Sequence, residues 1–139
     1  LQFAFGGNDL SENPDIPYRH TATSVVYTGT HDNAPTRSWF TSAQEQEKKN
    51  IAGYIGQDIH LEAANAALAR LAFASVAEYA VLPVQDALDL GDEARMNTPG
   101  IAKGNWGWRL TPGQLTPERL AWLKEYANVY GRLPDSRAC

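Results

Sequence analysis

The sequence predicts an α/β fold in which parallel strands are surrounded by helices. Residues 24–28 are mostly β-branched or aromatic and are apolar on consecutive positions, a pattern typical of a strand covered on both faces. Residues 1–5 and 79–84 are interpreted as two further strands. Polar residues follow all three directly, as expected at the edge where parallel α/β sheets and barrels bind their ligands.

The N-terminal half alternates strand, loop and helix. After the strand expected at 1–5, the stretch to residue 22 is rich in Gly, Asn, Asp and Pro and is interpreted as a loop. The strand at 24–28 comes next, and Pro35 fits the first turn of a helix. Residues 43–55 are polar on most faces, which indicates a helix exposed to solvent.

The C-terminal half repeats this alternation. Residues 59–76 carry apolar residues at helical spacing and much alanine, which predicts a helix packed closely on a neighbour. The strand at 79–84 follows, and residues 87–95 indicate a short helical segment. A closing helix is predicted over 116–131, because Thr116 is a favourable cap and a proline follows it.

Composition excludes several classes of protein. The net charge is −4 and there is no basic stripe, which argues against a nucleic-acid partner. No apolar stretch is long enough to span a membrane. The one cysteine, Cys139, excludes an internal disulfide and a cysteine metal cluster and fits a reducing, intracellular compartment. Because the chain begins at Leu1 and its only methionine is Met96, we expect it to be a piece of a longer protein.

Two short stretches carry the side chains best suited to chemistry. His31, Asp32 and Asn33 follow the strand at 24–28, where an imidazole, a carboxylate and an amide are better placed for a ligand than for a core. Asp and Asn are also ordinary turn and helix-capping residues, so this alternative stays open. Trp106 and Trp108 are flanked by glycines, and a tryptophan can stack on a sugar ring or anchor a loop by burial.

Four segments together resemble the amylomaltase family, the 4-alpha-glucanotransferases that are also called disproportionating enzymes. Their order and spacing match the C-terminal part of that family, and the resemblance covers nearly the whole chain. The segments are Val-Val-Tyr-Thr-Gly-Thr-His-Asp-Asn at 25–33, Leu-Pro-Val-Gln-Asp at 82–86, Glu-Ala-Arg-Met-Asn-Thr-Pro-Gly at 93–100 and Gly-Asn-Trp-Gly-Trp-Arg-Leu at 104–110.

The resemblance implies a fold and a reaction. The fold would be a (β/α)8 TIM barrel, of which residues 1–139 form one segment, the C-terminal part, with the rest of the barrel upstream of Leu1. The reaction would be retaining transfer of α-1,4-glucan segments from a maltooligosaccharide or α-glucan donor to a sugar acceptor. Such an enzyme would need no metal and no cofactor, and would be cytoplasmic, or plastidial in a plant or alga.

The resemblance also implies roles for five residues. Asp32 matches a catalytic carboxylate that stabilises the oxocarbenium-like transition state, and His31 would hold the same sugar. Asn97 matches a position expected to touch glucan, and Asn33 and Trp106 are expected to bind substrate as well. The family's nucleophile and general acid lie on earlier strands, and neither motif occurs in this sequence.

Two alternatives remain beside this interpretation. One is that the chain is a non-catalytic, glucan-binding fragment. The other is a different barrel glycoside hydrolase that uses His31 and Asp32 directly, with Asp86 or Asp9 as its second carboxylate. We expect the isolated chain to be inactive as a transferase, and to be ordered only within a longer protein or when paired with another copy.

Overall fold

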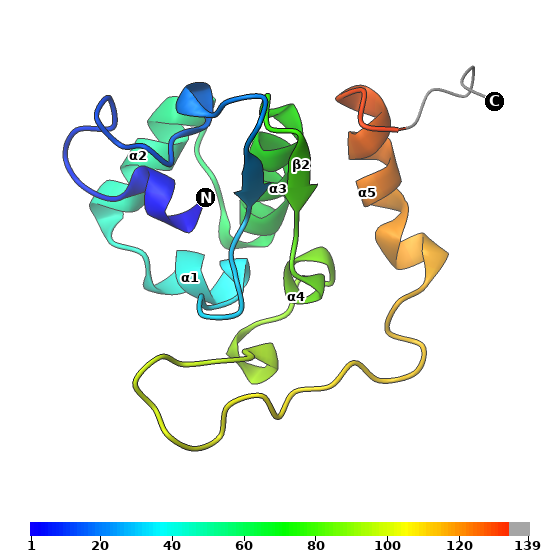
Figure 1. Ribbon diagram of the computed structural model, residues 1–139. Helices are drawn as coiled ribbons and strands as arrows, with labels where there is room; N and C mark the ends of the chain where they lie inside the picture. The colour runs from blue at the N-terminus through cyan, green and yellow to red at the C-terminus, as the bar shows by residue number, and fades with distance from the viewer. Residues whose placement is uncertain (134–139) are drawn as a thin grey trace.

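A computed structural model describes residues 1–133, so Cys139 lies outside the described residues (Figure 1). The described chain is a mixed α/β structure. Its sheet consists of two parallel strands, β1 (Val25–Tyr27) and β2 (Tyr79–Val81), in which Val26 pairs with Ala80. A small parallel sheet among helices is the class that the sequence predicts.

The strands lie inside the ranges expected at 24–28 and 79–84 and are shorter than both. The strand expected at residues 1–5 is wrong: η1 (Gln2–Phe5) is a 3-10 helix. In η1 the side chains of Ala4 and Phe5 are fully buried, whereas Phe3 is 68% exposed. Short apolar runs do not distinguish a strand from a helical turn by periodicity alone, which is why the sequence misleads here.

Helices cover one face of the sheet. The α-helices are α1 (Thr36–Ser42), α2 (Glu45–Ile55), α3 (Ala64–Ala74), α4 (Val84–Ala87) and α5 (Pro117–Val129). Single 3-10 turns lie at η2 (Pro17–Arg19), η3 (Leu61–Ala63) and η4 (Asp92–Ala94). Among the helices of residues 1–133, none is long and apolar enough to cross a bilayer.

Local sequence signals explain most helix boundaries. Gln44 and Glu47 form a capping box at the start of α2, and Gly56 ends that helix in the left-handed conformation (φ 83°), which glycine adopts without strain. The Thr116 hydroxyl accepts a hydrogen bond from the N–H of Arg119 and so caps α5. Pro35, which was expected in the first turn of a helix, is instead the N-cap residue of α1, which begins at Thr36.

The core lies between the helices and the adjacent sheet face. Its smaller cluster joins Val26 of β1 to Ala72 and Ala77, so Val26 is the β1 side chain that points toward α3. The larger cluster is made by η1 and the first three α-helices: Ala4, Phe5, Phe40, Ile51, Ala64 and Leu68. The alanines of α3 permit the close packing expected of that helix.

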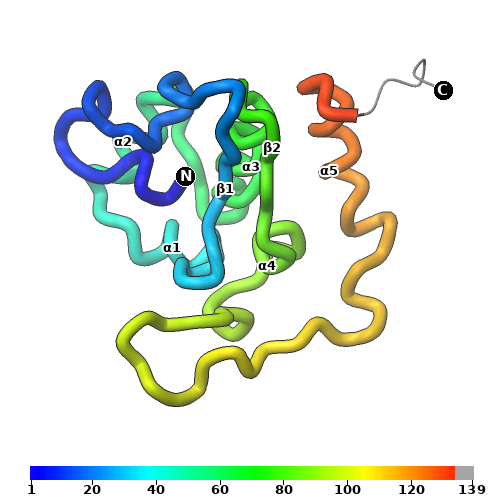
Figure 2. Tube along the Cα trace, viewed as in Figure 1, coloured from blue at the N-terminus to red at the C-terminus, as the bar shows by residue number. Residues whose placement is uncertain are grey.

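The α5 helix is reached by a long loop that passes below the ends of both strands (Figure 2). The Arg70 guanidinium lies 4.6 Å from the ring centroid of Tyr126, the buried side chain of α5. Directly after α5, the guanidinium of Arg132 donates hydrogen bonds to the carbonyl oxygens of Phe73 (2.7 Å) and Ser75 (2.7 Å) at the end of α3. These contacts satisfy helix-end carbonyls and attach α5 to α3.

Candidate active site

The carboxyl ends of β1 and β2 meet at one edge of the sheet, because the strands are parallel. A pocket of about 450 Å³ opens there. Its lining comes from both strand ends, the loop after β1, α4 and the loop after α4, and includes Tyr27, His31, Asn33, Val81, Gln85, Asp86 and Met96. This is the edge at which parallel α/β folds bind their ligands.

Asp32 lies at this edge beside His31 and Asn97. The Asn97 amide nitrogen donates a hydrogen bond to Oδ1 of Asp32 at 2.5 Å, and Nε2 of His31 lies 3.3 Å from the same oxygen. The side chains of His31 and Asp32 are 55% and 51% exposed, so the carboxylate is oriented by a neighbour and still open to solvent. Residues 65 positions apart in the sequence thus meet in one cluster.

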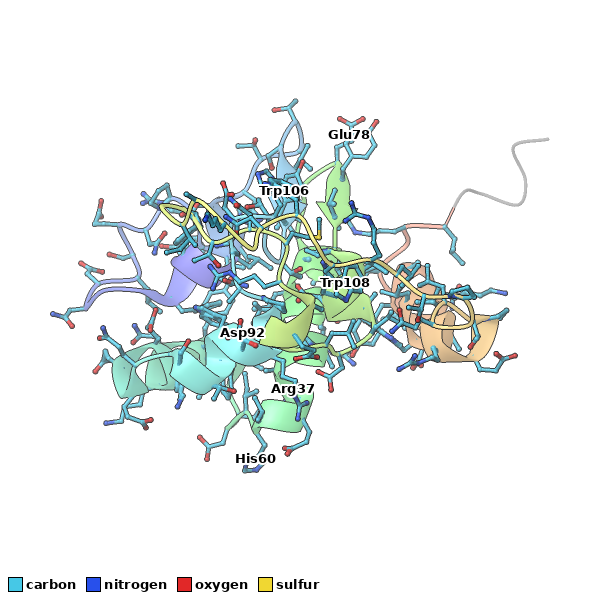
Figure 3. All side chains as sticks on the ribbon, turned by 90° about the horizontal axis from the view of Figure 1, so that it is seen from below. Arg37, His60, Glu78, Asp92, Trp106 and Trp108 are labelled. Atoms are coloured by element: carbon cyan, nitrogen blue, oxygen red, sulfur yellow. The ribbon has the colours of Figure 1, made fainter. Side chains whose placement is uncertain are left out.

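Trp106 extends the cluster with an aromatic surface. Its ring centroid lies 5.1 Å from that of His31, and the residue is 52% exposed. Figure 3, seen from below, shows Trp106 and Trp108 on the loop that crosses the strand ends. Trp108 is half-buried, so the more exposed tryptophan of the pair is the one beside His31. An exposed indole next to a carboxylate suits a ligand with an apolar face and hydroxyl groups.

The loop that carries Trp106 is braced from within. The N–H of Trp106 donates to the carbonyl oxygen of Met96 at 2.6 Å, and Trp106 itself adopts a left-handed φ of 62°. The Asn105 side chain accepts a hydrogen bond from the N–H of Thr98 (2.9 Å) and donates to the carbonyl of Ile101 (2.7 Å). A bulky residue with positive φ is uncommon, and these bonds are what hold it there.

Arg95 connects this loop to the loop after β1. Its guanidinium donates to the backbone carbonyl of Asp32 (3.2 Å) and to the backbone carbonyl of Asn97 (3.0 Å). The two residues that share the 2.5 Å hydrogen bond are therefore also joined through their backbones. Reasoning from the sequence did not assign this role, although Arg95 lies inside the segment 93–100 that carries the resemblance.

Asn33 lies in the pocket wall, but its side chain forms hydrogen bonds within its own turn. Its side-chain oxygen accepts hydrogen bonds from the N–H (2.8 Å) and the hydroxyl (3.0 Å) of Thr30, which closes the turn 30–33. For Asn33, the turn-residue alternative therefore describes the observed contacts. The Asp32 carboxylate is different, because its partners are His31 and Asn97 rather than the backbone of its own turn.

The two other carboxylates considered for catalysis have other surroundings. Asp86 is 3% exposed and accepts hydrogen bonds from the side chains of Thr28 and Thr36. Asp9 is exposed on the N-terminal loop, where hydrogen bonds from the hydroxyl and N–H of Ser11 lower its pKa. Within residues 1–133, no group of three or more His, Cys, Asp or Glu residues is arranged to hold a metal ion.

Comparison with known proteins identifies the family. A family model described as 4-alpha-glucanotransferase matches residues 1–116. The 4-alpha-glucanotransferase of Thermus thermophilus is 48% identical over 139 residues, which is 96% of this chain and 27% of that protein. The 4-alpha-glucanotransferase of Synechocystis is 42% identical over 133 residues, covering 95% of this chain and 26% of that protein.

The structure agrees with this match. It is similar to the amylomaltase from Streptococcus agalactiae in complex with acarbose, with a TM-score of 0.84 and 32% sequence identity, over 94% of this chain and 26% of that one. The chain thus spans about a quarter of the length of the relatives it matches. These findings confirm the resemblance drawn from four short segments: the chain belongs to the 4-alpha-glucanotransferase family.

Proposed function

We propose that the chain is the C-terminal part of the (β/α)8 catalytic barrel of a 4-alpha-glucanotransferase. The whole enzyme would transfer α-1,4-glucan segments from a maltooligosaccharide or α-glucan donor to a sugar acceptor, with retention at the anomeric carbon. The observation that carries the proposal is the cluster of Asp32, His31, Asn97 and Trp106 at the carboxyl end of two parallel strands.

The bare face of the sheet supports the barrel. Val25 and Tyr27 lie opposite Tyr79 and Val81 in the register, and all four are between 39% and 59% exposed. In a barrel, alternate residues of each strand face the helices and the interior. Val26 already faces α3, so its neighbours would face the interior, where further strands of the same polypeptide would cover them.

In this proposal Asp32 is the catalytic residue that the chain contributes. Positive charge develops on the sugar as its glycosidic bond breaks, and a fixed carboxylate stabilises that charge. The Asn97 hydrogen bond fixes the carboxylate, so it needs little reorganisation during the reaction. His31 and Asn97 would contact the same sugar, Trp106 would stack on a ring face, and Asn33 would contribute to the pocket wall.

The covalent steps belong to residues outside this chain in the proposal. Retaining chemistry needs a nucleophile and a general acid about 5–5.5 Å apart. Asp86 is already engaged by threonine side chains, which disfavours the alternative hydrolase. We therefore expect no transferase activity from these 139 residues alone. Incubating the isolated chain with maltotriose tests this, because release of glucose and longer oligosaccharides would contradict it.

The main experiment uses the whole enzyme that contains this chain. Replacing Asp32 with Asn keeps the side-chain shape and removes its charge, so maltotriose disproportionation should fall at least about 100-fold, as when an electrostatic stabiliser is lost. The thermal unfolding midpoint should stay within two degrees of wild type, roughly the shift expected for a small surface change in a large domain. The matched control is Asp9→Asn, an exposed aspartate outside the cluster.

An Asp32→Asn enzyme that keeps half or more of the wild-type rate would overturn the proposal.

Location is part of the same proposal: we place the enzyme in the cytoplasm, or in plastids if the source is a plant or alga. The Arabidopsis thaliana relative, 40% identical over 141 residues, carries the description chloroplastic/amyloplastic.

A further inference from the structure

Asp86 is a buried carboxylate in the first turn of α4, the short helix that follows β2. Its Oδ2 accepts hydrogen bonds from the hydroxyls of Thr28 (2.6 Å) and Thr36 (2.8 Å), and its Oδ1 accepts one from the backbone N–H of Thr36 (2.7 Å). Both threonines are almost completely buried. The carboxylate is therefore shared between the end of β1 and the start of α1.

These two threonines lie at opposite ends of the loop 29–35, which carries His31 and Asp32. Thr28 is the residue before the loop, and Thr36 is the residue after it. One carboxylate thus fixes the distance between the two ends of the loop. A second buried side chain, Gln2, supports the same loop by donating a hydrogen bond to the carbonyl of Ala34 at 2.9 Å.

Burying a carboxylate is costly unless donors compensate it, and an apolar side chain of similar volume often gives equal or greater stability. A role in stability alone is therefore a weak explanation for Asp86. Its three directional hydrogen bonds do something that apolar packing cannot, because they define the positions of specific backbone and hydroxyl groups. What those groups delimit is the loop that presents Asp32.

We propose that Asp86 is a positioning residue for the transferase reaction. It fixes both ends of the loop 29–35 and thereby sets where the Asp32 carboxylate and the His31 ring stand. Asp86 borders the pocket but is only 3% exposed, and both its oxygens accept hydrogen bonds from Thr28 and Thr36, so we expect it to act without contacting glucan. The inference rests on the function proposed for Asp32 and extends it to a residue that acts through the loop.

The test compares two substitutions of Asp86 in the whole enzyme. Asp86→Ala removes all three hydrogen bonds, and a loop displaced by about 1 Å should lower kcat for maltotriose disproportionation by roughly 10- to 100-fold. Asp86→Asn should restore most of the rate. Its amide oxygen can accept from the Thr36 N–H, while its NH2 group donates to threonine hydroxyls that accept as readily as they donate.

Asp89→Asn is the matched control. Asp89 lies three residues further along the same segment and also contacts α1, through an ion pair with Arg37 (2.8 Å), and it accepts a hydrogen bond from the Asn65 side chain of α3, so neither of its partners lies at an end of the loop 29–35. Its positive φ of 56° is one that asparagine tolerates. The rate of the Asp89→Asn enzyme should stay within about twofold of wild type, because the surface ion pair with Arg37 contributes little and the new amide oxygen can still accept the hydrogen bond from Asn65.

A double substitution separates positioning from general damage. If Asp86 acts through Asp32, Asp86→Ala should cost far less in an Asp32→Asn enzyme than in wild type, so the two losses are not multiplicative. Fully multiplicative losses, or an Asp86→Asn enzyme as slow as Asp86→Ala, would overturn the inference. Should Asp86→Ala fail to fold, Thr28→Val removes one of its hydrogen bonds in a milder way, and an unchanged kcat for that variant would equally overturn it.

The outcomes also distinguish this inference from the proposed function. An inactive Asp32→Asn enzyme together with a fully active Asp86→Ala enzyme contradicts the positioning role alone. An active Asp32→Asn enzyme contradicts the proposed function itself, whatever the Asp86 variants do.

Discussion

Replacing Asn97 tests whether its amide orients the Asp32 carboxylate, which we propose to be catalytic. The Asn97 side chain donates to Oδ1 of Asp32 at 2.5 Å. A hydrogen bond to a charged group contributes about 1.5–3 kcal/mol, and because Asp32 is half-exposed we use about 1.5 kcal/mol for its loss in Asn97→Ala. That value corresponds to a rate roughly tenfold below wild type.

Asn97→Asp should be slower than Asn97→Ala, because it replaces an attraction with a repulsion. Two carboxylates about 4 Å apart repel by about 1 kcal/mol in water and about 4 kcal/mol near a protein surface. The lower figure alone lowers the rate by about a further fivefold. Initial rates of maltotriose disproportionation by the whole enzyme, with Asn8→Asp on the exposed N-terminal loop as control, give this order directly.

Salt provides an independent check on the electrostatic cause. The Debye length falls to about 3 Å at 1 M salt, so the penalty specific to Asn97→Asp should shrink. The rate of Asn97→Asp divided by the rate of Asn97→Ala should therefore rise as NaCl is increased from about 0.05 to about 1 M, a range that includes 0.1 M, where the Debye length is about 10 Å. Equal rates for the two variants at low salt would refute the contact as the origin of the effect.

Two other regions of the structure give predictions of their own. Arg132→Ala removes the hydrogen bonds to the carbonyls at the end of α3 and should weaken the attachment of α5 by about 2–4 kcal/mol. Amide hydrogen exchange in α5 should therefore become faster, and the increase should be smaller for Arg132→Lys. Unchanged exchange in α5 would contradict the prediction. Trp106→Ala should raise the KM for maltotriose by about tenfold and Trp106→Phe by less, because a ring remains for stacking; equal KM values for Trp106→Ala and wild type would argue against stacking.

The sequence predicted β1 and α5 well and residues 1–5 badly, for a physical reason. The local signals for these two elements are the β-branched residues at 24–28 and the helix cap at Thr116, and tertiary contacts do not override either of them. At the N-terminus the apolar run at residues 1–5 was interpreted as a strand, but residues 2–5 form a 3-10 helix. In that helix Gln2 is only 4% exposed, because its amide donates a hydrogen bond to the carbonyl of Ala34.

The residues of the candidate site also fall into two groups, those that a local sequence pattern indicates and those that depend on long-range contacts. His31 and Asp32 are neighbours in the sequence, so their meeting at a strand end was visible as a pattern. Asn97 and Trp106 entered through the resemblance, and the structure brings both to this edge. The tasks of Arg95 and Asp86 were not predicted, because each depends on contacts with residues 50 or more positions away that no local pattern records.

The uncovered sheet face has a practical consequence for handling this chain by itself. One face of the sheet carries a contiguous apolar surface made by Val25, Tyr27, Tyr79 and Val81. In the part of the chain that the structure describes, the sheet has only these two strands, so the outer edge of each strand has no partner strand. Surfaces of this type drive self-association and precipitation. Preparations of these residues alone should therefore bind hydrophobic dyes and sediment as aggregates, and a soluble sample will require either the neighbouring strands or polar substitutions on that face.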